Sequence, residues 1–285
     1  MAARSDGARR WRLAIGAGVP AVVFGLATAV VLGGQAVVGA AGSELTPVAA
    51  EVAPGRPLLP HTDLATVTRP GFAGRDLDCT AVKCVAITFD DGPGAQTSAL
   101  LQMLRRAGAV ATWFPVGQVA ADHPERLRAI AAAGHEIGNH SWSHPPLTTL
   151  GDADVDRQVS RTADAVERAI GRAPTLVRPP YGSISARIQS DLARLGAPAI
   201  LWDVDPLDWK YRDAAAVHAH VMDQVRPGSI VLLHDIHAST VAAVPRLLAS
   251  LADEDYTFVT VSELFGGRLH PGRVYTDRAA AYRAP

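Results

Sequence analysis

Two pairs of side chains in this sequence have the types and spacing of a hydrolytic metal site. Asp90 and Asp91 are adjacent, and His140 and His144 stand four positions apart, close enough to bind one ion from a single turn. Two histidines and one carboxylate with an open position form a hydrolytic zinc pattern, and other divalent metals accept the same ligands. Asp91, His140 and His144 are therefore candidate metal ligands; surface or packing histidines are the alternative.

Two neighbouring carboxylates are costly to hold together unless something neutralises them. A cation bound by Asp91 does so and leaves Asp90 free to act as a general base on a water molecule. The planar donors of Arg178 can orient Asp90 and keep it ionised. An Asp-Asp-Gly-Pro turn, in which the carboxylates only accept backbone hydrogen bonds, is the alternative, and the turn and the site can coexist.

Hydrolysis of an amide also needs a proton for the departing nitrogen. His234 directly follows the apolar run 230–233, and an imidazole titrates near working pH. Asp208 can hold the His234 ring and raise its pKa. The alternative for Asp208 and Trp209 is a loop acid beside a core tryptophan, and for Asp205 that alternative is preferred.

Short apolar runs alternate with amphipathic stretches from residue 85 onward. One amphipathic stretch spaces its apolar residues on a single helical face: Val155, Val159, Val166 and Ile170. A strand-then-helix rhythm repeated about seven times predicts an α/β domain with parallel strands, closed as a barrel or barrel-like sheet. The expected strands are 85–89, 111–116, 136–138, 175–177, 199–202, 229–233 and 258–261.

The candidate residues stand directly after these expected strands. In a parallel barrel such positions lie on the face at the C-terminal ends of the strands, where barrel enzymes carry their sites. Residues far apart in sequence are therefore expected to converge. In chain order they are Asp90 and Asp91, His140 and His144, Arg178, Asp205 and Asp208, and His234.

Five segments, in order and with suitable spacing, resemble the polysaccharide deacetylases, the family-four carbohydrate esterases with a NodB homology domain. The resemblance covers roughly 85–265, and it implies a distorted (β/α) barrel with Asp90 as the base and His234 as the acid. It also implies a divalent metal, zinc or else cobalt, nickel or manganese, on Asp91, His140 and His144. The segments are 88–93 (TFDDGP), 140–144 (HSWSH), 178–182 (RPPYG), 205–209 (DPLDW) and 232–235 (LLHD).

The same resemblance implies roles for residues around these. Arg178 would orient Asp90, Asp208 would tune His234, and the backbone amide of Tyr181 would stabilise the oxyanion. Trp209 would form a wall of the sugar groove, and Leu232 would line the pocket for the acetyl methyl. One departure is visible, because the family often has a basic residue before the segment 111–114 (ATWF), where this chain has Ala109 and Val110.

The N-terminal part has the composition of an export element. Four arginines lie within residues 4–12, and no charged residue follows until Glu44. Residues 1–42 are a signal peptide or an uncleaved signal-anchor, and a membrane tether through 13–42 stays open. The proline-rich stretch 43–78 is interpreted as a linker, 79–265 as the catalytic domain and 266–285 as a surface or partly disordered tail.

The two cysteines, Cys79 and Cys84, lie where the linker meets the first strand. In an exported protein, a pair this close predicts one small disulfide. Two free buried thiols are the alternative, since close spacing does not guarantee bridging geometry.

The charge balance and the export element limit the partners. With 27 basic and 28 acidic residues, the chain offers no electrostatic case for nucleic acid. We expect a monomer on the extracellular side that acts on an N-acetylated glycan polymer, peptidoglycan first and chitin oligomers next. An acetylxylan-type esterase and a non-catalytic glycan-binding wall protein are the alternatives.

Overall fold

A computed structural model describes residue 75 and residues 77–279. The predicted export element 1–42 lies outside these residues, together with nearly all of the linker and the last six residues of the tail. Within the described part of the chain, no helix is both long enough and apolar enough to cross a membrane.

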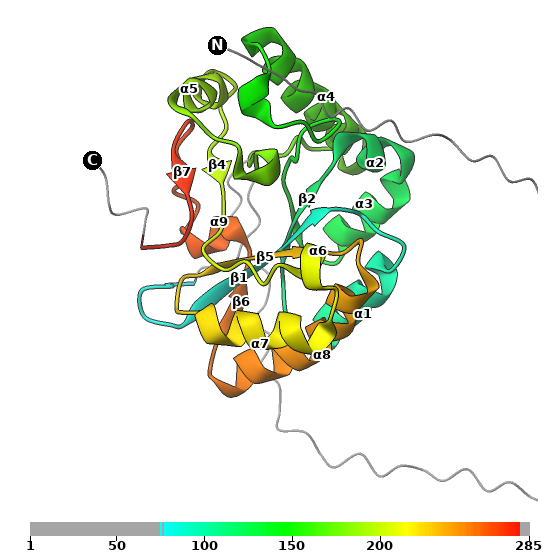
Figure 1. Ribbon diagram of the computed structural model, residues 1–285, viewed down its shortest axis with the longest axis vertical. Helices are drawn as coiled ribbons and strands as arrows, with labels where there is room; N and C mark the ends of the chain where they lie inside the picture. The colour runs from blue at the N-terminus through cyan, green and yellow to red at the C-terminus, as the bar shows by residue number, and fades with distance from the viewer. Residues whose placement is uncertain (1–74, 76, 280–285) are drawn as a thin grey trace, which may run out of the picture. The chain divides into compact units, whose positions relative to one another are not determined.

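A parallel sheet of five strands forms the centre of the fold (Figure 1). Its middle strand, β1, has apolar, β-branched or aromatic residues from Cys84 to Phe89 and is buried from Cys84 to Asp90, as expected for a strand covered on both faces. β1 pairs in parallel with β2, β5 and β6, and β2 pairs with β3. The strands are β1 (Cys84–Asp91), β2 (Thr112–Pro115), β3 (Glu136–Ile137), β5 (Ile230–His234) and β6 (Thr257–Val259).

Helices join and cover these strands. Figure 1 shows α1, α7 and α8 grouped on one side of the sheet and α2, α3 and α4 grouped on another. The helices are α1 (Thr97–Arg106), α2 (Gly117–Asp122), α3 (Pro124–Ala132), α4 (Asp152–Ile170), α5 (Ala186–Arg194), α6 (Asp208–Tyr211), α7 (Ala214–Gln224), α8 (Ala238–Asp253) and α9 (Val261–Leu264), with 3₁₀ turns at Leu147–Thr149 and Pro180–Gly182.

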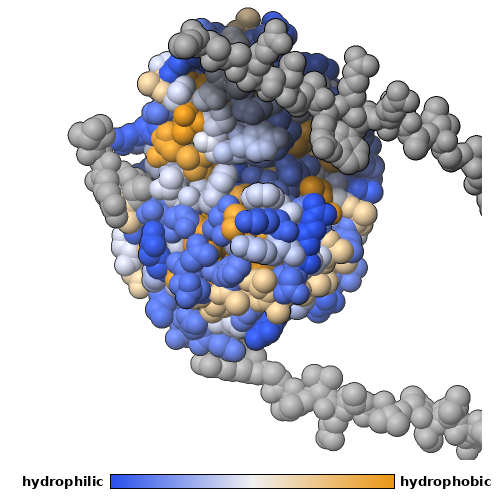
Figure 2. Space-filling model, in the orientation of Figure 1, coloured by the Kyte–Doolittle hydropathy of each residue, from blue (hydrophilic) through white to orange (hydrophobic). Residues whose placement is uncertain are grey.

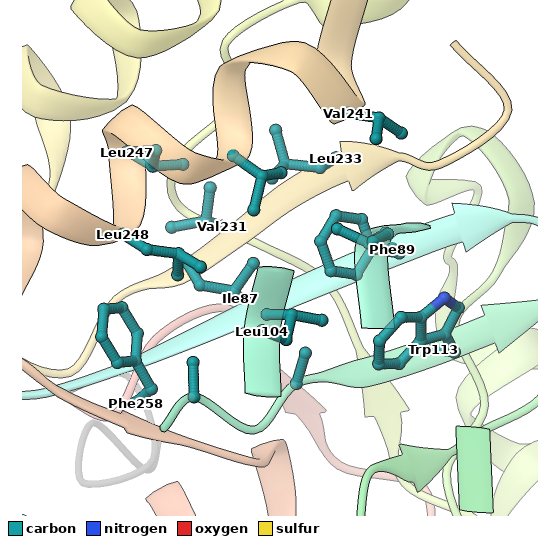
Figure 3. Close-up of a cluster of buried hydrophobic side chains, with 14 of the residues drawn as sticks. Ile87, Phe89, Leu104, Trp113, Val231, Leu233, Val241, Leu247, Leu248 and Phe258 are labelled. Carbon is teal, nitrogen blue, oxygen red and sulfur yellow. The ribbon is translucent and has the colours of Figure 1, made fainter. Parts of the chain in front are cut away.

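Alternation along β1 and β5 separates the hydrophobic core from the polar residues at the strand ends. Ile87 and Phe89 of β1 and Val231 and Leu233 of β5 belong to one buried cluster with α1 and α8 (Figure 3). The intervening residues point to the opposite face, since side chains alternate along a strand. Those residues are Thr88, Asp90, Leu232 and His234, so the core packing directs the chemically active side chains away from the helices.

The helix predicted from the four apolar residues of 155–170 is α4. Val155, Val159 and Val166 are buried, and Ile170 packs against the main core. Acidic residues in its first turn suit the helix dipole, and Gly171 ends it with a φ of 76°. The periodicity therefore predicted both the helix and its buried face.

The α/β class and the parallel strands are confirmed, but the described residues do not form a continuous barrel. The stretch 175–177, expected to be a strand, contributes only isolated parallel bridges from Val177 to Asn139 and to Ala199. Pro174 and Pro179 bracket it, and because prolines lack the N–H that a ladder needs, pairing cannot extend. A further single bridge joins Val204 to Val231.

The expectation of a surface tail after residue 265 fails for one segment. β7 (Val274–Tyr275) pairs in parallel with β4 (Ala199–Ile200), and Tyr275 is buried against Phe265. A strand of two residues is too short to show an alternating pattern of apolar and polar residues, so it could not be recognised in the sequence. At the other end of the domain, Cys79 and Cys84 are joined in a disulfide, which decides between the two alternatives.

Candidate active site

Asp90 is held by a buried arginine. Arg178 Nη1 donates to Asp90 Oδ1 at 2.7 Å and to Thr88 Oγ1 at 2.7 Å, and the Arg178 and Asp90 side chains are 0% and 2% exposed. The guanidinium also lies over the Phe114 ring, 4.1 Å from its centroid. Burial raises the pKa of Asp90 above its usual value, and the charge of Arg178 opposes that rise.

Asp91, His140 and His144 direct ligand atoms toward one point. His140 Nε2 and His144 Nε2 are 3.1 Å apart, and Asp91 Oδ1 lies 3.7 Å from the first and 3.3 Å from the second. Among the described residues, Asp91 Oδ1 is a buried oxygen without a hydrogen-bond partner. A divalent cation would satisfy this oxygen and both ring nitrogens, so the three residues fit a metal ion.

The protonation state of His140 suits a ligand. Its Nδ1 lies 2.7 Å from the carbonyl oxygen of Arg178, which can only accept, so Nδ1 carries the proton and Nε2 presents a lone pair. Burial lowers the pKa of His140 to about 3, which keeps the ring neutral. Arg178 therefore contacts Asp90 through its side chain and His140 through its backbone.

His234 is oriented by a fully buried carboxylate. Its Nδ1 lies 2.7 Å from Asp208 Oδ1, and its backbone N–H donates to Asp208 Oδ2 at 2.8 Å. Burial alone would lower the pKa of His234, but the hydrogen bond and charge of Asp208 raise it to about 9. The imidazolium form is therefore favoured near neutral pH, as a proton donor requires.

Asp90 and His234 stand beside each other on adjacent strands. They are register partners in the parallel ladder between β1 and β5, as are Thr88 and Leu232. Paired residues of a ladder project from the same face of the sheet. The side chains of Asp90 and His234 thus share one face, and Asp90 Oδ2 also lies 3.5 Å from Nε2 of the candidate ligand His140.

Two exposed aromatic residues are neighbours of these side chains, one in space and one along the chain. Tyr181, with a φ of 59°, places its ring 4.6 Å from that of His144 and is 68% exposed. Trp209 follows Asp208 in α6 and is 47% exposed. On the surface shown in Figure 2, hydrophobic residues occur in small groups among hydrophilic ones.

Comparison with known proteins identifies the family. A family model described as polysaccharide deacetylase matches residues 78–200. The chitooligosaccharide deacetylase of Sinorhizobium fredii is 36% identical in an alignment of 208 residues that covers 68% of this chain and 93% of that protein. The chain belongs to the polysaccharide deacetylase family.

A longer relative and a solved structure also resemble this chain. Peptidoglycan-N-acetylglucosamine deacetylase PgdA of Listeria monocytogenes is 39% identical over 197 residues, covering 69% of this chain but only 42% of PgdA. This chain thus spans about two fifths of that relative. A structure described as T48 deacetylase with substrate is 41% identical, covers 70% of this chain and 99% of its own, and superposes with a TM-score of 0.67.

All the site residues expected from the family resemblance lie within the described part of the chain, and contacts join most of them. Arg178 links Asp90 to His140, the three candidate ligands surround one point, and Asp208 holds His234. Leu232 is 3% exposed and lies two residues before His234, on the same face of β5. Asp205 accepts a hydrogen bond from the Leu207 amide at 2.8 Å, which agrees with its interpretation as a loop acid.

Two supporting residues were not found from the sequence. Thr240 in α8 donates to Asp208 Oδ2 at 2.7 Å, and the buried Asp235 accepts from Thr97 Oγ1 at 2.6 Å and from the Gly94 amide at 3.2 Å. A Cβ at Gly92 would collide with the Asp235 carboxylate, so this loop needs glycine. Because Asp235 directly follows His234 in the sequence, it could have been predicted as a supporting residue. Nothing in the sequence around Thr240 indicates its contact with Asp208.

Proposed function

We propose that this chain is a metal-dependent hydrolase that removes N-acetyl groups from an amino-sugar polymer, with peptidoglycan as its substrate. One observation carries the proposal: Asp90 and His234 are paired on adjacent strands, and Asp90 Oδ2 lies 3.5 Å from Nε2 of the candidate ligand His140. A base, a metal site and an acid therefore border the same small volume.

Asp90 is assigned as the general base. It takes a proton from the attacking water as the water oxygen bonds to the acetyl carbonyl carbon. Arg178 donates a hydrogen bond to Oδ1 of Asp90, and the other oxygen, Oδ2, lies toward the candidate ligand His140. A positioned base of this kind contributes about a hundredfold to ten-thousandfold in rate.

Asp91, His140 and His144 are assigned as ligands of one divalent ion, zinc in the first instance and cobalt, nickel or manganese as alternatives. When bound, such an ion acts as a Lewis acid on the acetyl carbonyl and makes water more acidic. The hydrogen bond from His140 Nδ1 to the Arg178 carbonyl leaves the lone pair of Nε2 available, so that this atom would bind such an ion.

His234 is assigned as the general acid. It gives a proton to the departing nitrogen while the carbon–nitrogen bond breaks, so the products are acetate and the free amino sugar. Asp208 is assigned as the residue that orients the His234 ring through a hydrogen bond with Nδ1 and raises the pKa of His234. Since the carboxylate of Asp208 is also fixed by Thr240, the imidazole has one preferred orientation.

Three residues are assigned to the substrate. The backbone N–H of Tyr181 stabilises the negative oxygen of the tetrahedral intermediate, and such a donor is typically worth about a hundredfold or more in rate. Trp209 offers an exposed apolar surface to a sugar face, and Leu232 lines the pocket for the acetyl methyl group.

Peptidoglycan is preferred as substrate because of the predicted export element and the names of the relatives. A chain carried across the membrane by residues 1–42, whether secreted or anchored there, meets the cell wall first. PgdA is named for peptidoglycan N-acetylglucosamine, whereas the Sinorhizobium relative is named for chitooligosaccharides. Residues 79–265 are proposed as the catalytic domain, acting as a monomer.

The test is acetate release from a panel of substrates. Purified protein is incubated with cell-wall fragments, N-acetylglucosamine oligomers and acetylated xylan, each with and without a chelator. The proposal expects most acetate from cell-wall fragments, and only without chelator. Greatest release from xylan would identify an esterase, and no release from any substrate would favour the glycan-binding alternative.

A further inference from the structure

The turn that carries both candidate histidine ligands has an unusual backbone. Ser141 and His144 adopt φ values of 63° and 61°, in the left-handed region that side-chain-bearing residues seldom occupy. Such a conformation persists only where surrounding contacts hold it. The separation of His140 Nε2 and His144 Nε2 depends on that backbone, because the two rings leave opposite ends of the turn.

Gln158, on the second turn of α4, fastens the middle of this segment. Its Oε1 accepts hydrogen bonds from the backbone N–H groups of Trp142 and Ser143, at 2.8 and 2.9 Å. Its Nε2 donates to Ser143 Oγ at 2.9 Å. One side chain therefore contacts both residues that lie between Ser141 and His144.

Neighbouring parts of α4 hold the rest of the turn. The Asn139 side chain donates to the carbonyl of Val159 at 2.8 Å and accepts from the Ser141 amide at 2.9 Å. Arg161 lies over the Trp142 ring, 4.0 Å from its centroid. The buried face of α4 makes it a rigid support, and among its described side chains Gln158 is the one that accepts hydrogen bonds from two amides of the turn.

We propose that Gln158 is a positioning residue for the metal ligands His140 and His144. It fixes two amides of the turn, keeps Ser141 and His144 in their left-handed conformations, and so sets the separation of the two ligand nitrogens. The inference rests on the proposed function, since it assumes that these histidines bind a metal ion.

The test measures metal binding by the full chain rather than turnover. The affinity for Zn²⁺ is determined by competition with a chromophoric chelator, and the visible absorption of bound Co²⁺ reports ligand geometry. We expect Gln158→Ala to weaken Zn²⁺ binding about tenfold to a hundredfold, as loss of outer-shell support commonly does, and to change the Co²⁺ spectrum.

Rescue separates positioning from general stability. Gln158→Glu keeps the oxygen that accepts from the two amides, and its second oxygen can accept a hydrogen bond from the Ser143 hydroxyl, so wild-type affinity and spectrum should return. Gln224→Ala is the matched control, because the Gln224 side chain donates to the His220 carbonyl of its own helix, α7, and not to the turn that carries the two histidines. Thermal unfolding of each variant checks the fold, and Gln158→Met, which keeps the side-chain volume, replaces the alanine variant if that does not fold.

The two proposals fail differently. Failure of the wild-type chain to bind Zn²⁺ or Co²⁺ would overturn the metal site and, with it, the role of Gln158. Metal binding by the wild type, together with unchanged affinity and spectrum in Gln158→Ala or Gln158→Met, would overturn the role of Gln158 alone.

Discussion

Asp90 and His234 face each other as register partners across the ladder between β1 and β5. They lie 144 positions apart in the sequence, yet the strand pairing gives their side chains a common face. Each has its own buried counter-charge, Arg178 for Asp90 and Asp208 for His234. The pair therefore places a carboxyl group that contacts a guanidinium beside an imidazole whose pKa Asp208 raises.

Substitution Asp90→Asn should separate catalysis from metal binding. The amide keeps the side-chain shape but cannot take a proton from water, so kcat should fall about a hundredfold to ten-thousandfold. Zn²⁺ affinity should stay within a few-fold of wild type, because Asp90 is outside the ligand set. Acetate release and chelator competition measure the two quantities. Loss of metal binding in this variant would instead make Asp90 a ligand.

Removal of the Arg178 charge should affect both stability and rate. Arg178→Met leaves the Asp90 carboxylate buried without its partner, and breaking a buried ion pair in this way costs about 3–5 kcal/mol of unfolding free energy. Asp90 should also become harder to ionise, so activity should fall at neutral pH. Denaturant unfolding and acetate release check this. The surface variant Arg128→Met is the control, and equal stability of the two variants would contradict the assignment.

The pH dependence should report the His234–Asp208 pair. With a His234 pKa of about 9, kcat/KM should fall as the pH rises through that value and the acid loses its proton. The pair also contributes stability that is fully present below pH 6.5, the ordinary histidine pKa, and that is lost as the pH rises through about 9. Profiles of kcat/KM and of unfolding free energy against pH measure both effects.

In Asp208→Asn, the hydrogen-bonded carboxylate that raises the pKa is gone while burial still lowers it. The alkaline limb should therefore move down by about two pH units or more. Asparagine would also direct an amide N–H at groups that are themselves donors, so stability should fall as well. The position of the limb, rather than the absolute rate, carries this prediction, and an unmoved limb would exclude His234 as the acid.

Chelation should abolish activity reversibly. Removal of the ion leaves Asp91 Oδ1 and two ring nitrogens directed at one another, and added Zn²⁺ or Co²⁺ should restore the rate. His144→Ala should not be restored at the same metal concentration. His218→Ala is the control, because the His218 ring hydrogen-bonds to Ser250 between α7 and α8. Its activity should be lost on chelation and restored by added metal, as in the wild type. Full activity after exhaustive metal removal would refute the mechanism.

Reduction of the Cys79–Cys84 disulfide should affect stability but not turnover. A loop this short is worth about 2 kcal/mol in the chain-entropy account. Cys84 starts β1 and Asp91 ends it, so the disulfide and the site lie at opposite ends of the strand. Denaturant unfolding and acetate release with and without a phosphine reductant measure both. The sequence has only these two cysteines, so any change comes from this bond.

The sequence alone indicated the kinds of residue at the site and their place at strand ends. Alternation of apolar and polar residues reports burial directly, and hydrolytic metal sites draw on few residue types. Asp90, Asp91, His140, His144, Arg178, Asp208 and His234 could therefore be selected, and the α4 face and the parallel α/β class were predicted correctly.

Only the tertiary structure decided which side chains meet and what supports them. Strand register pairs Asp90 with His234, and packing of α4 and α8 brings Gln158 and Thr240 to the site. No local pattern encodes these contacts, because they depend on how distant elements pack. For the same reason, the short strand containing Tyr275 was missed, since its pairing with β4 is set by tertiary packing rather than by local period.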